Sequence, residues 1–311
     1  MERNKKDRLI QMLQNELNAG NVYIDEPLSR RTTFRIGGKA SVLVVCENEE
    51  QLRSVLHICD NEAVRWFLLG NGSNVLVADE GYDGVIIKLS GDFCNVRLIE
   101  EINEGTALFV AGAGMMLTQL SLFALKKGFT GLEFAHGIPG TVGGAVFMNA
   151  GAYGGEIKQT IYTVKAMKPD GSIVTYSGDE LGMGYRKSRF TESDEIVLEA
   201  SFRLKVYHRI VIRALMEGYK KARIAKQPLD VPSAGSTFKR PEGAYAGALI
   251  EQVGLKGYAV GGAAVSKKHA GFVVNNGNAT CADVLTLVNH ICKTVKEQTG
   301  YELEPEIRLV K

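Results

Sequence analysis

Three short segments of the sequence carry side chains that can hold charge and transfer a proton. They read Tyr-Arg-Lys-Ser at residues 185–188, Ala-Gly-Ser-Thr-Phe-Lys at residues 234–239 and Glu-Pro-Glu-Ile-Arg at residues 304–308. Among them are a guanidinium (Arg186), a hydroxyl (Ser236) and a carboxylate (Glu306). We expect folding to bring these groups into one site that stabilises negative charge and moves a proton.

Each segment taken alone also has an ordinary structural explanation. Arg186 can form a surface ion pair, which usually contributes little to stability. Ser188 and Ser236 can be turn or helix-capping residues, and Glu306 can be a solvated carboxylate at the end of a strand. Only the three segments together favour a catalytic site.

Two loops rich in glycine and asparagine precede these segments, Gly70–Asn74 and Gly137–Gly144. Such loops can offer backbone N–H groups to phosphates. The first loop lies between two predicted strands, which fits neither a P-loop nor a Rossmann fingerprint, because both open a helix. Alone it is explained by a tight turn; with the second loop it favours phosphate binding.

The second loop belongs to a longer stretch, residues 131–156, in which most side chains are small. Its backbone can lie against a flat, extended ligand, and Thr141 and Asn149 can add fixed hydrogen bonds. A packing loop is the structural alternative.

Hydrophobic spacing and turn residues predict the elements that position these segments. Helices are expected at 6–18, 48–61, 118–128, 207–225, 245–253 and 280–298. Strands are expected at 66–69, 85–89, 96–99, 108–111, 163–168, 173–176, 196–204, 260–265, 272–275 and 306–310. Residues 32–45 are expected to form two strands around the Gly37-Gly38 turn. The pattern predicts an α+β chain with an N-terminal helix (1–24), a two-lobed domain (25–206, lobes 25–90 and 91–206) and a smaller α/β domain (207–311).

Composition is that of a globular protein: 311 residues, 45% hydrophobic, 23% charged and a net charge of +2. No global field indicates nucleic acid or an anionic membrane as partner, and no obligate protein partner is inferred. The five cysteines show neither a disulfide framework nor a zinc spacing, so we expect no metal and buried free thiols. Without a signal peptide or membrane-spanning run, the protein is expected in the cytoplasm.

The ordered set of motifs resembles two related groups of flavoproteins. Thr33–Gly38, Gly70–Asn74 and Gly137–Gly144 are similar to the FAD-binding fold of the vanillyl-alcohol-oxidase / p-cresol-methylhydroxylase type. Together with the three charged segments they resemble the UDP-N-acetylenolpyruvoylglucosamine reductase family, over about residues 25–310. The short distance from Arg186 to Ser236 resembles the family's shorter class, which lacks an extra loop with a substrate-covering tyrosine.

The resemblance implies noncovalent FAD, with NADPH as reductant and a UDP-sugar enolpyruvyl ether as substrate, and gives His136 no covalent role. It implies that FAD is bound by Arg35, Asn71, Gly72, Ser73, Asn74, Gly112, Gly137, Ile138, Gly140, Thr141, Gly144, Asn149 and Gly151. It implies substrate contacts from Tyr153, Lys226, Lys239 and Arg240.

The implied reaction adds hydride to an enol ether and leaves negative charge beside a carboxylate. Arg186, whose planar fork can hold a carboxylate, would stabilise that charge. Ser236 would give the carbanion its proton, and Glu306 would polarise the carboxylate or hold Arg186 or a water. Two alternatives remain open at this point: an FAD oxidase of the same fold acting on an alcohol or sugar, and a non-enzymatic nucleotide-binding module.

Overall fold

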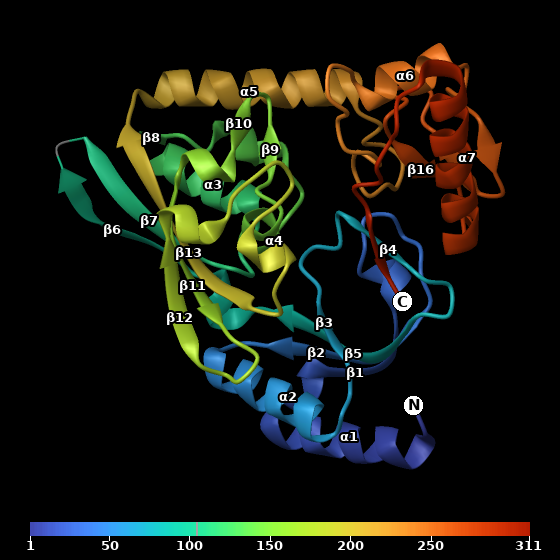
Figure 1. Cartoon of the computed structure of the whole chain (residues 1–311). Coiled ribbons are helices and arrows are strands. Elements are labelled where there is room, and N and C mark those ends of the chain that lie inside the picture. Colours follow the sequence, from blue (N-terminus) through green and yellow to red (C-terminus); the bar gives the residue numbers. More distant parts are fainter. Residues whose placement is uncertain (104) are drawn as a thin grey trace. The chain divides into compact units, whose positions relative to one another are not determined.

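The computed structural model describes residues 1–103 and 105–311, which form two compact units built from separate stretches of chain (Figure 1). Unit 1 contains residues 1–23, 42–71 and 85–223; unit 2 contains residues 24–41, 72–84 and 224–311. These boundaries differ from the linear ones expected from the sequence, because two N-terminal stretches group with the C-terminal part of the chain. The domain boundaries therefore stay a prediction.

The larger part of unit 1 is an antiparallel sheet with two helices. The sheet has the order β12-β11-β13-β7-β6, with β8 paired to β13. Its strands are β6 (Val96–Asn103), β7 (Thr106–Gly112), β8 (Phe129–Thr130), β11 (Ile161–Met167), β12 (Ile173–Ser177) and β13 (Ile196–Val206). Helices α3 (Leu117–Lys127) and α4 (Val142–Phe147) pack on this sheet (Figure 1). Five buried phenylalanines contribute to this core: Phe109, Phe129, Phe134, Phe190 and Phe202.

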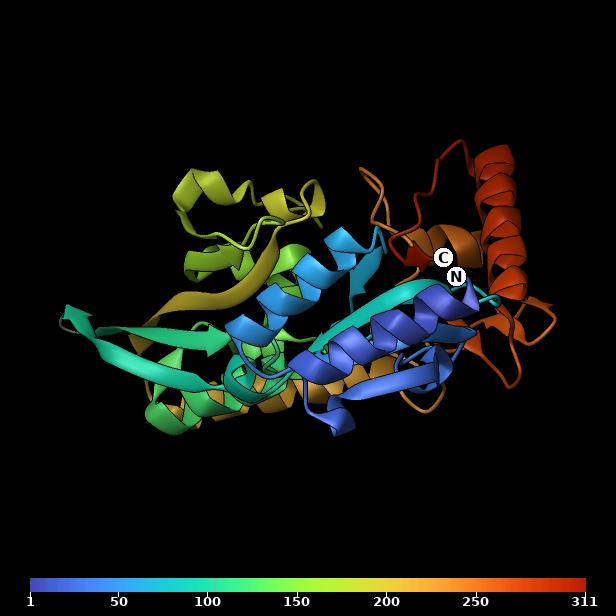
Figure 2. The ribbon, with the colours of Figure 1, turned by 90° about the horizontal axis from the view of Figure 1, so that it is seen from below.

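A second layer of unit 1 contains two helices that lie side by side, α1 (Arg3–Glu16) and α2 (Glu49–Asn61) (Figure 2). Asn48 caps α2 by accepting the N–H of Gln51, and Leu52, Val55 and Leu56 then recur at helical spacing and are buried. They pack on the sheet of order β1-β2-β5-β3, in which β3 (Trp66–Leu68) runs parallel to β5 (Tyr82–Leu89).

The chain passes from one unit to the other within four elements, which are β1 (Val22–Pro27), β2 (Lys39–Cys46), β5 and α5 (Arg209–Lys226). Unit 1 also holds a two-stranded hairpin, β9 (Gly151–Ala152) and β10 (Gly155–Glu156), at the end of the glycine-rich stretch.

Unit 2 has its own core between two helices and a small antiparallel sheet. The helices are α6 (Ala246–Gln252) and α7 (Cys281–Thr299), and the sheet is formed by β14 (Ala259–Val260), β15 (Ala263–Val265) and β16 (Val273–Asn275). Helix α7 begins with a capping box between Thr280 and Asp283 and ends at Gly300 in the left-handed conformation. The last strand, β17 (Arg308–Val310), pairs in parallel with β4 (Val75–Val77).

All six predicted helices are confirmed, and two strand predictions are wrong. Residues 32–36 do not form a strand; the chain turns there, and the strand before β2 is β1, Val22–Pro27. Residues 260–265 are not one strand but the β14–β15 hairpin, because Gly261 adopts a positive φ of 53° between them. No cis peptide bond interrupts the described backbone.

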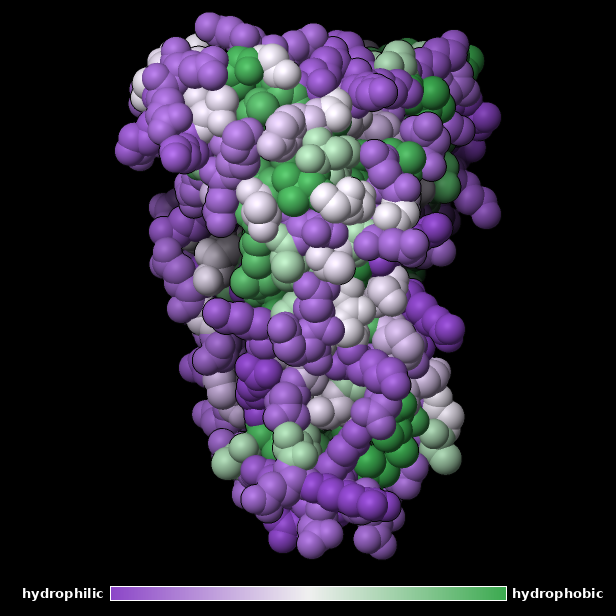
Figure 3. Space-filling model, turned by 90° about the vertical axis from the view of Figure 1, so that its right-hand side faces the viewer, coloured by the Kyte–Doolittle hydropathy of each residue, from purple (hydrophilic) through white to green (hydrophobic). Residues whose placement is uncertain are grey.

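The surface is polar over most of the face that Figure 3 shows, with apolar side chains in small groups. Among residues 1–103 and 105–311, no helix has the length and apolar character needed to cross a membrane. All five cysteines are free thiols. Cys46, Cys59 and Cys281 are buried and Cys292 is half-buried, but Cys94 is exposed, so the expectation of buried thiols is wrong there.

Candidate active site

The predicted site residues are distributed over both units. Asn71, most of the glycine-rich stretch, Tyr153 and Arg186 lie in unit 1. Arg35, residues 72–74 and the predicted residues from Lys226 onward lie in unit 2. Each half is described below by itself.

In unit 1, the end of the first glycine loop lies directly against the second loop. The Asn71 side-chain amide donates a hydrogen bond to the Pro139 carbonyl at 2.7 Å. A Cβ on Gly70 would lie 2.9 Å from Thr141 Oγ1, so no larger residue fits there without a shift. Lys88 Nζ donates to the Gly70 carbonyl at 2.5 Å. The two loops that sequence reasoning treated as partners are thus brought together.

Helix α4 continues the second loop. Thr141 caps it, its Oγ1 accepting the Gly144 N–H at 3.3 Å. The Gly143 N–H donates to the Ala113 carbonyl at 2.8 Å, and a Cβ on Gly143 would come 2.9 Å from the Ala113 Cβ. The helix therefore lies close to the chain that follows β7, where only small residues are accommodated.

Packing alone explains several of the glycines assigned to FAD. A Cβ on Gly112 would lie 2.2 Å from the Phe93 carbonyl oxygen, and one on Gly151 would lie 2.7 Å from the Gly155 carbonyl oxygen. Gly144 differs, because its Cβ would meet only Thr141 Oγ1, at 3.5 Å. Of these three glycines, Gly144 is thus the one at which a larger side chain tests ligand binding rather than folding.

Asn149 is 1% exposed, and its side chain is used within the protein. Its amide group donates to the Gly184 carbonyl at 2.9 Å and to Glu156 Oε2 at 3.2 Å, while its oxygen accepts the Lys158 N–H at 2.9 Å. Asn149 therefore connects the glycine-rich stretch to the turn that bears Arg186. Its assignment to FAD binding stays a prediction.

Arg186 lies at the tip of a tight turn. Gly184 and Lys187 pair across it, the Gly184 N–H donating to the Lys187 carbonyl at 2.9 Å. Arg186 has a φ of 54°, a conformation that non-glycine residues seldom adopt and that is often found at functional sites. Its guanidinium carbon lies 5.2 Å from the ring centre of Tyr185. Ser188 is fully buried, and its hydroxyl donates to the Phe147 carbonyl at 2.7 Å, which is a structural role.

Tyr153 also has a positive φ, 54°, and its ring stacks on that of Tyr219 in α5. The ring centres are 4.8 Å apart and the planes differ by 9°. Sequence reasoning missed Tyr219; the only signal was its position on the same helix face as the buried Ile212 and Met216. Burial raises the pKa of Tyr153 and lowers that of Arg223, and the attraction between the two groups opposes both shifts.

His136 lies beside the same helix. Its carbonyl accepts the Thr118 hydroxyl at 2.8 Å, whereas its Nδ1 is buried and has no hydrogen-bond partner among the described residues. Burial, together with the nearby Lys220, lowers the pKa of His136. A Cβ on Gly137 would lie 3.2 Å from the Arg223 side chain. This corner of unit 1 thus combines two cations with an unsatisfied ring nitrogen.

In unit 2, the remainder of the first glycine loop is held by two separate stretches of chain. Gly72 has a φ of 65°, and its Cβ would lie 2.4 Å from the Arg31 carbonyl oxygen, so glycine is required there for packing. The Gly72 carbonyl accepts the Thr33 N–H at 3.1 Å. The Asn74 amide donates to the Glu306 carbonyl at 3.2 Å, and the Asn74 carbonyl accepts the Arg308 N–H at 3.1 Å.

Ser236 and Glu306 lie on adjacent stretches of chain. Thr237, which follows Ser236, joins the two stretches and is fully buried. Its carbonyl accepts the Glu306 N–H at 2.8 Å. Its N–H donates to the Gly271 carbonyl and its Oγ1 accepts the Val273 N–H, both at 2.8 Å. The pairing continues with the Lys239 N–H, which donates to the Glu304 carbonyl at 2.8 Å. Ser236 itself is exposed within its unit. The backbone segments that bear Ser236 and Glu306 are therefore brought together.

The predicted substrate-binding cations lie near these two residues in the sequence. Lys239 Nζ forms an ion pair with Glu304 Oε1 at 2.5 Å, with side chains 33% and 67% exposed. The Arg240 guanidinium lies 4.0 Å from the ring centre of Tyr245. Lys226 is exposed and ends α5. All three are positioned where surface contact with an anion is possible.

Unit 1 by itself offers groups that suit a dinucleotide. The backbone at Gly144 has room beside it, and the buried Nδ1 of His136 and the half-buried Arg223 supply polar partners for a ring system. Within the described residues, the residues present fit FAD.

Comparison with known proteins supports this interpretation. Residues 40–177 match a family model described as an FAD binding domain, and residues 227–310 match the C-terminal domain of UDP-N-acetylenolpyruvoylglucosamine reductase. A protein of that name from Caldanaerobacter subterraneus is 46% identical over 97% of this chain and 98% of its own. One from Clostridium botulinum is 44% identical over 100% of this chain and 99% of its own.

A solved structure gives the same result. The crystal structure of UDP-N-acetylenolpyruvylglucosamine reductase (MurB) from Thermus caldophilus has a TM-score of 0.78 and 36% identity, and covers 93% of this chain and 98% of its own. The expected α+β fold with an FAD-binding domain is confirmed. This chain belongs to the UDP-N-acetylenolpyruvoylglucosamine reductase (MurB) family and is an FAD-dependent oxidoreductase.

Proposed function

We propose that this chain uses NADPH and FAD to reduce the enolpyruvyl group of UDP-N-acetylglucosamine enolpyruvate, giving UDP-N-acetylmuramate for peptidoglycan precursor synthesis in the cytoplasm. The relatives that carry the reductase name match it over nearly their full length. The observation that carries the proposal is the pairing of the Ser236 and Glu306 segments through the Glu306 N–H and the Thr237 carbonyl. This pairing supports the proposal, because it holds the segment of the proposed proton donor beside the segment of the proposed carboxylate.

Three side chains have separate roles in this reaction. Arg186 offers a permanent positive charge to the substrate carboxylate, on which negative charge develops. Ser236 donates its proton to the carbon beside that carboxylate. A hydroxyl is a weak acid, but the acceptor is a strongly basic carbanion, so the transfer is favourable. Glu306 polarises the carboxylate or orients Arg186 or a water.

FAD, when bound, supplies the hydride transfer that connects NADPH to the enolpyruvyl double bond. Noncovalent binding is proposed, with the two glycine loops at the phosphates. The residues proposed to bind FAD come from both units. Those in unit 1 are Asn71, Gly112, Gly137, Ile138, Gly140, Thr141, Gly144, Asn149 and Gly151. Those in unit 2 are Arg35, Gly72, Ser73 and Asn74. His136 is proposed as a neighbour rather than as a point of covalent attachment. Acid precipitation should therefore leave FAD in the supernatant, and a yellow pellet would contradict noncovalent binding.

The sugar nucleotide is proposed to be held by its diphosphate and its flat groups. Lys226, Lys239 and Arg240 are the cations, since lysine and arginine pair with phosphate oxygens. Tyr153 offers a ring whose position is set by its stack on Tyr219.

The reaction is tested by adding the two substrates in turn under anaerobic conditions. NADPH should bleach the flavin absorbance, and the enolpyruvyl sugar nucleotide should then restore it without oxygen. If only oxygen restores the absorbance, the chain is an oxidase of the same fold and the proposed function is wrong.

A further inference from the structure

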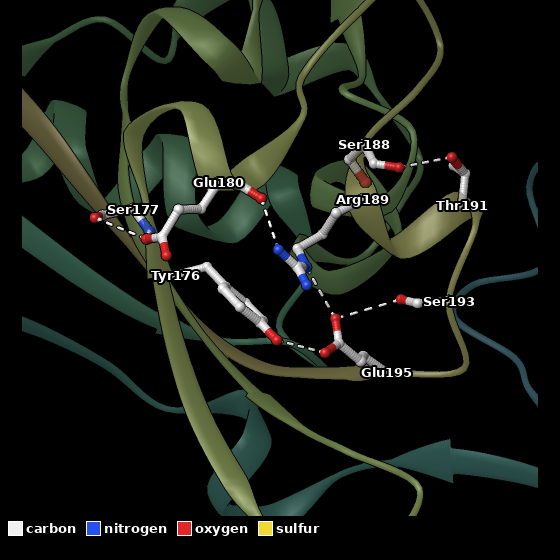
Figure 4. A network of polar contacts seen from close by, with 8 residues as sticks. All are labelled: Tyr176, Ser177, Glu180, Ser188, Arg189, Thr191, Ser193 and Glu195. Carbon is white, nitrogen blue, oxygen red and sulfur yellow. Dashed lines mark hydrogen bonds and ion pairs between the residues drawn. The ribbon is translucent and has the colours of Figure 1, made fainter.

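A network of three side chains braces the turn that bears Arg186 (Figure 4). The Arg189 guanidinium carbon lies 3.6 Å from the ring centre of Tyr176 in β12. Its Nε donates to Glu195 Oε2 at 3.0 Å, and its Nη1 donates to the Glu180 carbonyl at 2.9 Å. The Tyr176 hydroxyl donates to Glu195 Oε1 at 2.5 Å. The three side chains thus close a ring of contacts just after the turn.

Burial makes this network different from a surface ion pair. The Glu195 side chain is 9% exposed and that of Arg189 is 32% exposed. Burial tends to raise the pKa of Glu195, but its hydrogen bonds to Tyr176 and Arg189 more than offset it, and the pKa is lowered. The same hydrogen bond to Glu195 raises the pKa of Tyr176. The Glu195 carboxylate is therefore ionised at neutral pH and accepts both hydrogen bonds.

Both ends of the turn are also tied to the glycine-rich stretch. Before the turn tip, Asn149 donates to the Gly184 carbonyl, and after it the Ser188 hydroxyl donates to the Phe147 carbonyl. Between these ties and the Arg189 network, the turn keeps Arg186 at a φ of 54°. Such a conformation persists only where the surrounding contacts determine it. Arg189 and Ser188 together hold the turn on its C-terminal side.

We infer that Arg189, with Tyr176 and Glu195, is a positioning group that fixes the Arg186 turn for reaction with the substrate. A guanidinium is needed because one planar group must stack on a ring and donate in two directions, which lysine cannot do. In this role Arg189 acts through Arg186. Because Arg186 meets the substrate only under the proposed function, the test includes a measurement that does not depend on turnover.

The kinetic test uses Arg189→Met, Arg189→Lys and Tyr176→Phe, with Arg97→Met as matched control. Arg97 also forms an ion pair in unit 1, with Glu199 at 2.8 Å, but on β6. In Arg189→Met, reduction of FAD by NADPH should stay within about twofold of wild type, whereas reoxidation by the enolpyruvyl sugar nucleotide should slow about tenfold or more. Arg189→Lys should recover only part of this loss, Tyr176→Phe should show a smaller loss, and Arg97→Met should show none.

A double variant separates positioning from general stability. If Arg189 acts through Arg186, then Arg186→Ala/Arg189→Met should reoxidise no more slowly than Arg186→Ala alone. The inference would be overturned if the losses in reoxidation rate of the two single variants multiply in the double variant. It would also be overturned if folded Arg189→Met is reoxidised at the wild-type rate. If Arg189→Met does not fold, the same comparison made with Arg189→Lys and Tyr176→Phe decides.

Hydrogen exchange tests the same inference without substrate. The Lys187 N–H donates across the turn to the Gly184 carbonyl at 3.3 Å. This N–H should exchange faster in Arg189→Met than in wild type, and at the wild-type rate in Arg97→Met. Unchanged exchange in Arg189→Met would overturn the positioning role whatever the substrate is. If the enolpyruvyl sugar nucleotide does not reoxidise the wild-type protein, but the Lys187 N–H still exchanges faster in Arg189→Met, only the proposed function is contradicted.

Discussion

The backbone N–H of Glu306 donates a hydrogen bond of 2.8 Å to the carbonyl oxygen of Thr237. With the bond from the Lys239 N–H to the Glu304 carbonyl, it holds the segment before β17 beside the segment that carries Ser236. Thr237 is itself held by Gly271 and Val273 through its N–H and its hydroxyl oxygen. The placement of the segments that bear the proposed acid and carboxylate therefore depends on a buried residue between them in the hydrogen-bond pattern.

Thr237→Val should destabilise the protein by about 1–3 kcal/mol, because the Val273 N–H loses its acceptor and stays buried. Thr237→Ser keeps that acceptor and serves as the matched control. The free energy of unfolding in guanidinium chloride measures the difference. Equal stability of the valine and serine variants would show that this hydrogen bond is dispensable.

Gly144→Leu should fold but purify with less FAD. A Cβ at this position makes only an ordinary contact of 3.5 Å with the protein, so folding is not disturbed. FAD would be lost because the leucine side chain occupies the space proposed for the cofactor. Gly218→Leu is the control, since it adds the same side chain to α5 where nothing lies within 4 Å. The flavin absorbance per protein and the circular dichroism spectrum measure both effects. Full FAD occupancy in a folded Gly144→Leu protein would remove this glycine from the cofactor site.

Lys239→Ala should raise the KM for the sugar nucleotide with little change in kcat, because a phosphate contact binds substrate and transition state alike. Lys256→Ala is a close control in the same unit. Lys256 pairs with Glu251 at 2.7 Å and is 34% exposed, against 33% for Lys239. A loss confined to kcat would place Lys239 in the chemical step, and equal KM values for both variants would show that it does not bind substrate.

Alkaline pH should destabilise the protein through two buried thiols. Burial raises the pKa of Cys46 from the ordinary 9.0 to about 12, and the nearby Cys59 adds to this shift. Burial also raises the pKa of Cys59 from 9.0 to about 12. The unfolded chain ionises first, so this stabilisation is full below pH 9 and is lost as the pH rises toward 12. Melting temperatures across this range should fall more steeply for wild type than for Cys59→Ala, while exposed Cys94→Ala should follow wild type more closely. Parallel curves for wild type and Cys59→Ala would contradict the assignment.

Local signals in the sequence were enough to predict the helices. The spacing of Leu52, Val55 and Leu56 predicted α2, and the spacing from Val284 to Val295 predicted α7. The strand expected at residues 32–36 failed for a tertiary reason. A Cβ on Gly38 would lie 2.3 Å from the Asp79 carbonyl oxygen, so this stretch turns against a distant loop instead of pairing.

The candidate site was predictable as a set of motifs but not as a geometry. The bond from Asn71 to Pro139 brings the two glycine loops together, and their role in FAD binding stays a prediction. Three residues that hold the motifs in place were missed: Thr237, Tyr219 and Arg189. Thr237 acts through partners far away in the sequence, Tyr219 through its side of a helix, and Arg189 through side chains that come together only when the chain around it folds. No local pattern distinguishes them from ordinary buried or surface residues.

The central claim is that Ser236 supplies the proton after hydride has left the flavin, and stopped-flow absorbance tests it by timing the two halves of the reaction separately. In Ser236→Ala, NADPH should reduce FAD at nearly the wild-type rate, while reoxidation by the enolpyruvyl sugar nucleotide should slow by about two orders of magnitude or more. Ser236→Cys should recover part of that rate, since a thiol can also donate a proton. If Ser236→Ala slows the NADPH half as much as the other half, or slows neither, Ser236 is not the acid.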